Sequence, residues 1–308
     1  MRRLAERITP TKTLWSVVVA LGILFPVTAR GQGAPGPREY HNTPVNAGTF
    51  FADFLYNKTQ TASSSNLPAP NNETFSRVRV VTALYSFPLG SRYGGVGLTG
   101  GYTGVQGTGP NGDIKGSGFI DPGISFHANF FGAPALRKDE FAEKTPTTSS
   151  GLHFTVNAPL GSYDRNSPVN TGANRWAFYP LVNLSMTRDK GVSWIELYGG
   201  ARFFTNNNEF QGNNQLSQKP LAVLAAHYSH NIGKKWFAGA GLYYDNGGET
   251  SVNNVPQGNA ANGFRPGVTI SRKVWRYRVT VRYELTASTP HAAPTNGLVL
   301  LRLSGPLF

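Results

Sequence analysis

His227 and Ser229 are the two side chains whose types and spacing could do chemistry together. A strand would place residues two apart on one face, where an imidazole can serve as the base for a serine nucleophile. The pair adjoins a short turn at residues 231–234, and no third side chain is evident to orient the histidine. Hydrolase chemistry is therefore not predicted, and no catalytic residue is assigned.

Two other histidines and a glycine run invite metal or phosphate chemistry. His127 and His153 are predicted to be polar lumen side chains and not metal ligands, since the chain has no cysteine and no HxxxH-type spacing. The run at residues 94–97 resembles a phosphate-binding loop only superficially, because no helix follows it. Neither a metal nor a cofactor is predicted.

Arginines at every second position are the most suggestive feature. Arg276, Arg278 and Arg282 share one face of a strand, because strand side chains alternate with period two. The candidate side chains for an inner, lumen-facing surface are Arg77, Arg79, Glu196, Tyr198, Arg202, Arg276, Arg278, Arg282 and Glu284. Two interpretations remain open: a positive lumen that favours anions such as aromatic carboxylates, or an Arg and Glu network that only stabilises the interior.

Long alternating strands are the elements that must position these side chains. The stretch 174–204 predicts two strands joined by a turn at 187–191, with Ile195 and Leu197 on one face and Glu196 and Tyr198 on the other. A tilted strand needs about ten residues of such alternation to cross a hydrocarbon layer. The sequence therefore predicts an all-β fold, a transmembrane antiparallel up-and-down β-barrel.

About twelve strands are expected. Their predicted ranges are 49–56, 74–87, 93–102, 119–131, 151–159, 174–186, 192–204, 220–230, 235–245, 262–272, 274–285 and 297–308. Connections after even strands are mostly short and those after odd strands long, as in barrels whose termini both lie in the periplasm. We also expect a loop at 103–116, a bulge at Pro180, and a small helix at 135–143 that is either a plug or periplasmic.

The N-terminal residues have the organisation of a signal peptide. Arg2 and Arg3 precede an apolar run at 14–27, and small residues follow at Ala29 and Gly31. An apolar run of about 14 residues is shorter than the roughly 20 that a spanning helix needs. The sequence thus predicts a cleaved signal peptide at 1–31, a periplasmic lead-in at 32–48 and an outer-membrane barrel at 49–308.

Composition supports this class. Charged residues are only 15% of the chain, and 36 glycines accompany 19 Phe, 13 Tyr and 5 Trp, which suits packed strands with aromatic belts. The net charge of +13 raises the question of nucleic acid, but the basic residues are dispersed and the chain is expected to be exported. No nucleic-acid partner is predicted.

From about Asp121 to the end, the chain has several motifs that are shared with a known family. They are Asp121-Pro122, 131–136, 159–164, Asn174-Arg175-Trp176-Ala177-Phe178-Tyr179-Pro180 and 196–207. In these motifs the chain resembles the outer-membrane family named for the meta-pathway of phenol degradation. The resemblance implies a channel or transporter barrel in the outer membrane of a Gram-negative bacterium.

The expected function is a porin-like channel or transporter for small solutes, including aromatic or other hydrophobic catabolites. The alternative is a closed structural or surface-interaction barrel without transport, since twelve strands can enclose either a narrow pore or a packed network. An enzyme is not expected. The expected partners are outer-membrane lipid and lipopolysaccharide, the barrel-insertion machinery and a small-molecule solute.

Overall fold

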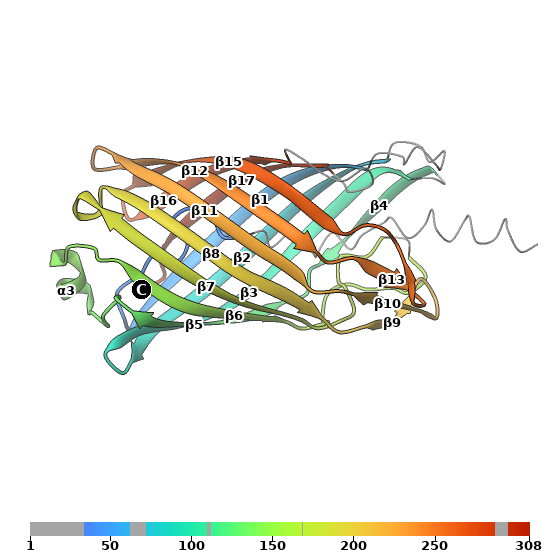
Figure 1. Cartoon of the computed structure of the whole chain (residues 1–308), viewed down its shortest axis with the longest axis horizontal. Coiled ribbons are helices and arrows are strands. Elements are labelled where there is room, and N and C mark those ends of the chain that lie inside the picture. Colours follow the sequence, from blue (N-terminus) through green and yellow to red (C-terminus); the bar gives the residue numbers. More distant parts are fainter. Residues whose placement is uncertain (1–33, 62–71, 110–111, 168, 287–294) are drawn as a thin grey trace, which may run out of the picture.

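One antiparallel sheet is rolled into a closed barrel (Figure 1). In order around the ring, its twelve strands are β1 (Ala47–Thr61), β2 (Asn72–Leu89), β3 (Arg92–Gly109), β5 (Gly123–Phe131), β6 (Ser149–Asn157), β7 (Ala177–Arg188), β8 (Ser193–Phe204), β11 (Leu221–Ile232), β12 (Trp236–Gly247), β15 (Ala261–Val274), β16 (Tyr277–Leu285) and β17 (Thr295–Pro306). The pairing of β2 with both β1 and β3 closes the ring. The predicted transmembrane barrel of about twelve strands is confirmed.

This computed structural model describes residues 34–61, 72–109, 112–167, 169–286 and 295–308. The predicted signal peptide at 1–31 lies outside the described residues. The C terminus lies at the end where β2 and β3, β7 and β8, β11 and β12, and β15 and β16 are joined by short turns (Figure 1). We call this the turn end, and the opposite end, where longer connections lie, the loop end.

Alternation of side chains along each strand gives the barrel two different faces. On β11, Val223, Ala225 and His227 are buried, whereas Leu224 and Tyr228, on the other face, are half exposed. The same pattern recurs around the ring, so large apolar side chains cover the outer surface. A contiguous apolar exterior is unfavourable in water and is the surface that lipid requires.

The predicted loop at 103–116 is wrong. β3 continues to Gly109, and its second half, from Tyr102 to Gly109, pairs with β4 (Gly112–Phe119) in a hairpin. The strand then breaks at 120–122 before β5 pairs with the other half of β3. Pro122 has no amide hydrogen for a ladder, and Asp121 instead accepts hydrogen bonds from loop amides, which accounts for the break.

The predicted bulge at Pro180 is also wrong. The register between β7 and β8 is the same on both sides of the proline, with Phe178 opposite Phe203 and Leu181 opposite Gly200. The proline backbone lies unusually close to β8, since a Cβ on Gly200 would lie 2.4 Å from the Pro180 carbonyl oxygen. Gly200 has no side chain and therefore allows this close approach, so the two strands accommodate the proline without a bulge.

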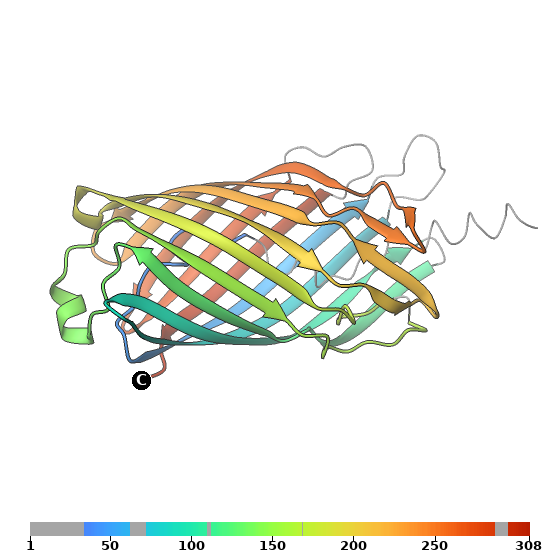
Figure 2. The same ribbon diagram turned by 60° about the horizontal axis from the view of Figure 1, so that its bottom comes forward.

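Two small features lie at the ends of the barrel. At the loop end, β9 (Asn207–Phe210), β10 (Asn214–Gln218), β13 (Thr250–Val252) and β14 (Val255–Pro256) form a second sheet. At the turn end, α3 (Lys138–Glu143) projects from the barrel with no buried residue (Figure 2). The helix predicted in this link is therefore present, and it lies outside the lumen. No helix among the described residues is both long and apolar enough to cross a membrane.

The segment before β1 is not a periplasmic lead-in. Residues 34–46, here called the lumen segment, have no regular secondary structure and pack against inner-face side chains of the barrel. Ala34 lies in a buried cluster with Leu181, Tyr198 and Tyr243. The sequence pattern predicted the irregular backbone correctly, but the contacts place this segment inside the lumen.

Candidate functional site

Arg38 fixes the lumen segment to one wall of the barrel. Its backbone N–H donates to Glu196 Oε2 at 2.8 Å, and its guanidinium donates to Ser229 Oγ at 2.8 Å and Asn231 Oδ1 at 2.6 Å. The guanidinium also lies 4.4 Å from the ring centre of Phe237. Burial lowers the pKa of Arg38 to about 10, so this side chain is still protonated at neutral pH.

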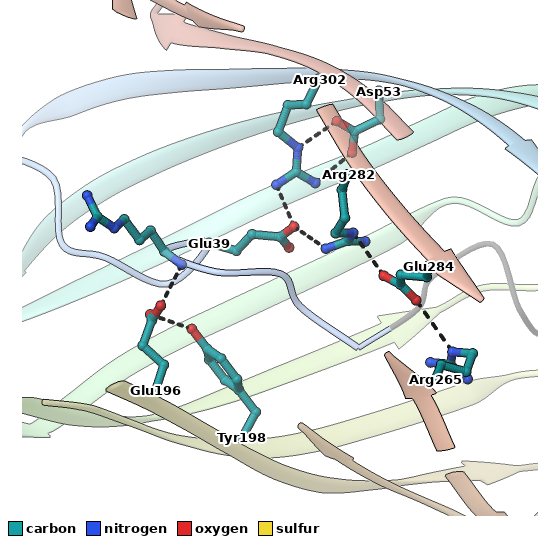
Figure 3. Close-up of polar contacts among 9 residues, drawn as sticks. Glu39, Asp53, Glu196, Tyr198, Arg265, Arg282, Glu284 and Arg302 are labelled. Atoms are coloured by element: carbon teal, nitrogen blue, oxygen red, sulfur yellow. Dashed lines mark hydrogen bonds and ion pairs between the residues drawn. The ribbon is translucent and has the colours of Figure 1, made fainter. Parts of the chain in front are cut away.

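Glu39 fixes the segment to the opposite wall. Its Oε1 accepts from Arg282 Nη1 at 2.8 Å and lies 3.0 Å from Arg302 Nη1 (Figure 3). Burial of Glu39 raises the carboxyl pKa, but Arg302 and Arg282 outweigh it and hold the pKa below its usual value of 4.5. Glu39 is therefore ionised at neutral pH.

Both arginines are also neutralised by the wall itself. Arg302 makes a bidentate pair with Asp53, at 2.6 and 2.7 Å. Arg282 Nε lies 2.9 Å from Glu284, which in turn is 3.4 Å from Arg265 (Figure 3). Arg265 also pairs with Asp245. Three arginines thus face four carboxylates, so this part of the lumen is a self-neutralised network and not an open positive surface.

Tyr40 and His41 fill the space between the walls. The Tyr40 ring stacks on His153 at 3.7 Å between centroids, and the His41 ring lies 4.0 Å from that of Trp194. His41 Nε2 is also 3.2 Å from Glu196 Oε1, to which Tyr198 donates at 2.7 Å. Glu196 is completely buried, so its charge depends on these partners.

The lumen segment continues to the turn end. Val45 N–H donates to the carbonyl of Leu136 at 2.8 Å, and Asn46 N–H donates to that of Ser86 at 2.8 Å. The Ser86 hydroxyl donates back to the carbonyl of Pro44 at 2.6 Å. These backbone contacts fix the segment at the barrel mouth, where β1 then begins.

The histidine and serine candidates have no catalytic arrangement. His227 and Ser229 share the inner face, but Ser229 accepts the hydrogen bond from Arg38, and neither ring nitrogen of His227 has a hydrogen-bond partner among the described residues. His153 bonds His127 at 2.9 Å and Asn183 at 2.8 Å, as polar lumen residues do. No group of three or more metal-binding side chains occurs within the described ranges.

Six of the nine candidate lumen residues lie on the inner face. They are Glu196, Tyr198, Arg202, Arg278, Arg282 and Glu284. Arg278 donates to Ser271 Oγ at 3.1 Å and lies 5.2 Å from the Phe237 ring centre.

The lumen prediction is wrong for the other three. Arg77 and Arg79 are exposed on the outer face of β2, opposite the outward-facing Tyr56 and Phe54, because Val78 takes the inner face. Arg276 is exposed in the turn between β15 and β16. Both faces of β2 carry apolar residues, so alternation alone does not tell the inner face from the outer one.

A cavity at the loop end has basic and aromatic walls. Arg175 lies 4.6 Å from the ring centre of Phe204, and Arg202 lies 4.6 Å from that of Tyr179. All four side chains line the cavity with Ile120 and Asp121. Burial lowers the pKa of Arg175 to about 10, so it carries its charge at neutral pH.

Arg175 is only partly satisfied. It donates to Gln218 through Nη2, but its Nε and Nη1 are buried with no hydrogen-bond partner among the described residues. A buried guanidinium with free donors at a cavity is suited to an anionic group. Sequence reasoning missed this residue as a site, although it lies in the shared motif at 174–180.

No local sequence pattern marks the residues of the ion-pair network that were not predicted from the sequence. Glu39 lies 243 residues from Arg282 in the chain, and no spacing rule connects them. Arg265 and Asp245 lie on adjacent strands, and only the register of β12 with β15 brings the two side chains together.

A closed ring of twelve antiparallel strands, apolar outside and filled with polar side chains inside, defines a transmembrane β-barrel. The chain belongs to the family described as "Putative MetA-pathway of phenol degradation", whose model matches residues 41–300. No curated protein is recognisably similar to the chain in sequence.

Solved structures share the fold. A COG4313 outer membrane channel from Pseudomonas putida F1 superposes with a TM-score of 0.76 at 17% identity, over 89% of this chain and 100% of that one. The beta domain of the Bordetella autotransporter Brka gives a TM-score of 0.51 at 11% identity, over 85% and 100%. These likenesses concern the fold alone.

Proposed function

We propose that the protein is an outer-membrane channel of a Gram-negative bacterium, and that the lumen segment closes it at rest. The turn end then faces the periplasm and the loop end the exterior. One observation carries this proposal: the lumen segment is held by side-chain and end contacts, not by strand pairing. Such a segment can leave the lumen without breaking the ring of strands.

Small aromatic solutes that carry an acidic group are the proposed cargo. Arg175 and Arg202 supply positive charge at the cavity of the loop end, and Tyr179 and Phe204 supply ring faces beside them. A guanidinium binds a carboxylate or sulfonate, whereas an aromatic ring packs on a planar apolar body. The description of the family, which concerns phenol degradation, is consistent with this class of solute.

A closed structural barrel is the second candidate. The observation that favours it is the dense interior network of Arg282, Arg302, Glu39 and Glu284, which joins one wall of the barrel to the lumen segment. The two candidates differ in whether solute crosses the barrel at all.

Uptake into proteoliposomes tests the proposed cargo. Benzenesulfonate has a ring and a permanent negative charge, and methanesulfonate has the same charge without the ring. We expect the protein to take up benzenesulfonate several-fold faster, and Arg175→Gln/Arg202→Gln to lose most of that difference. Arg165→Gln, in an exposed loop, is the matched control and should leave uptake unchanged.

Equal and slow uptake of both anions by correctly folded protein would contradict the aromatic-acid proposal. No uptake of any small solute, by the wild type or by a variant without the lumen segment, would favour the closed structural barrel instead.

A further inference from the structure

Arg77 and Arg79 occupy a position on the outer wall that the channel function does not explain. Along the outer face of β2, from the turn end, Phe87, Tyr85 and Val81 give way to these two arginines. The apolar band of the barrel therefore ends on this strand where the arginines begin. No described acidic side chain pairs with either arginine.

Neighbouring strands extend this positive surface. Lys58 on β1 stands opposite Phe75, and Lys115 on β4 stands opposite Gln106, in the row of outward positions next to that of Arg77. With successive outward positions about 7 Å apart and strands about 5 Å apart, the four basic groups fall within about 17 Å of one another. We call Lys58, Arg77, Arg79 and Lys115 the outer basic patch.

The outer basic patch adjoins outward-facing aromatic side chains. Tyr102 and Phe119 face outward beside Arg79 and contact each other edge to face at 5.5 Å. Tyr56 lies beside Arg77, with its ring 6.0 Å from that of Phe75. Aromatic side chains at this depth mark the boundary between hydrocarbon and headgroups, so the patch is at headgroup level.

Two acidic groups share this face, and neither neutralises the arginines. Glu73 pairs with Lys58, and Asp113 is one outward position nearer the loop end than Lys115. Both carboxylates therefore lie on the loop-end side of the outer basic patch, away from the apolar band. The positive charge of Arg77, Arg79 and Lys115 directly borders the lipid.

The patch is confined to one side of the barrel. At the loop end of the other barrel strands, the described outward side chains are aromatic, aliphatic or uncharged, among them Phe203, Tyr244, Phe264 and Val299. A general preference for basic residues at this rim would spread them around the ring. Their gathering on β1 to β4 indicates a particular ligand on that side.

We propose that the outer basic patch binds the phosphate groups of one lipopolysaccharide molecule in the outer leaflet. The lipid A phosphates lie at headgroup level, where guanidinium and ammonium groups bind them with charge-assisted hydrogen bonds. The acyl chains then lie along the apolar band below, against Phe54 and Val81, which are 51% and 57% exposed. This inference rests on the proposed outer-membrane orientation, but not on transport.

Binding of purified lipid A to the refolded full chain in detergent micelles tests the proposal. Bisphosphorylated lipid A is titrated, and its occupancy is read by native mass spectrometry beside dephosphorylated lipid A and phosphatidylglycerol. We expect one tightly bound molecule of the bisphosphorylated form, and at least tenfold weaker binding of the other two lipids. Arg77→Gln/Arg79→Gln/Lys115→Gln should lose at least tenfold in affinity, whereas Arg77→Lys/Arg79→Lys should retain most of it.

A matched control removes three exposed basic residues from the turn end, as Lys235→Gln/Arg272→Gln/Arg276→Gln. This variant should bind lipid A as the wild type does. Equal losses in the two triple variants, or wild-type affinity in the patch variant, would overturn the proposed site. So would wild-type self-association that the patch variant abolishes, since the patch would then be an interface between copies. None of these readouts depends on solute transport, so failure of the channel proposal is seen separately.

Discussion

Glu39 joins the lumen segment to two wall arginines at once, which makes its protonation state matter. Its pKa is held below 4.5 by Arg302 and Arg282 when the segment is docked, and an undocked Glu39 titrates near the usual value. Because the docked pKa is the lower one, the contribution of Glu39 to docking is complete above about pH 5. It is lost as the pH falls through the docked pKa.

Ion current through single barrels is therefore expected to stay low from pH 8 to pH 5 and to rise below about pH 4.5. Glu39→Gln removes the charged hydrogen bonds and should weaken docking by about 2 kcal/mol, or about 30-fold, already at pH 7. Glu140→Gln, on exposed α3, serves as the control and should behave as the wild type. A wild-type current that falls on acidification, or a Glu39→Gln current that matches the wild type at pH 7, would contradict this role.

The sequence predicted only some of the arginines that face the lumen. The spacing of Arg278 and Arg282 placed them correctly on one inner face, because alternation is a local property. Glu39, the partner of Arg282, comes from an irregular segment remote in the chain, where no periodicity applies. Arg77 and Arg79 were assigned to the wrong face because a charged pair suits both a polar lumen and a membrane boundary.

The strand pair β7 and β8 shows how one glycine sets the geometry of an element. A Cβ on Gly200 would lie 2.4 Å from the Pro180 carbonyl oxygen and 3.0 Å from the Leu181 Cα. Both are backbone atoms that cannot move without displacing the strand. Pro180 faces the lipid in a continuous register, so the local fit depends on the missing side chain of Gly200, which lies opposite Leu181.

Gly200→Ala is expected to destabilise the barrel by about 1–3 kcal/mol through this overlap. The measurement is thermal unfolding in detergent, followed by circular dichroism and by the migration of folded barrel on unheated gels. Gly199→Ala is the matched control, since its Cβ would meet only the flexible end of Leu224 at 3.4 Å. Equal stability of the two variants would show that β7 and β8 can separate without cost.

The presence of the strands could be predicted because the alternation of apolar and polar side chains over ten residues is a strong local pattern. The hairpin at 174–204 and the strand at 274–285 are predicted from it, and they are present as β7 with β8 and as β16, which begins three residues later than predicted. The extension of β3 to Gly109 was missed because glycines at 100, 101, 104 and 107 weaken the alternation. Pairing with β4, and not local preference, makes that stretch a strand.

The barrel consists of a rigid ring of strands and a lumen segment that does not belong to that ring. The ring pairs its strands all the way around, so it has no unpaired edge on which to open. The lumen segment, in contrast, is held by Arg38, Glu39, Tyr40 and His41 through contacts that are each modest. Closing and opening are thus expected to involve movement of the segment and not of the ring.

Fold class and strand number follow from the sequence because the bilayer fixes strand length and closure fixes pairing. The state of the lumen did not follow, since twelve strands can enclose either a pore or a packed network. The amino-acid composition and the alternation of side chains along the strands are the same for an open pore and for a packed network. The interior is decided by where residues 34–46 lie, and that depends on tertiary contacts alone.

Conductance in a planar bilayer tests most directly whether the lumen segment closes the barrel. The full chain is compared with a variant that lacks residues 34–45, after both are shown to fold by unheated-gel migration. We expect the full chain to be closed most of the time and the shortened chain to give a steady, larger current at pH 7. The same small current from both barrels would contradict the claim, because the wall itself would then be what closes the lumen.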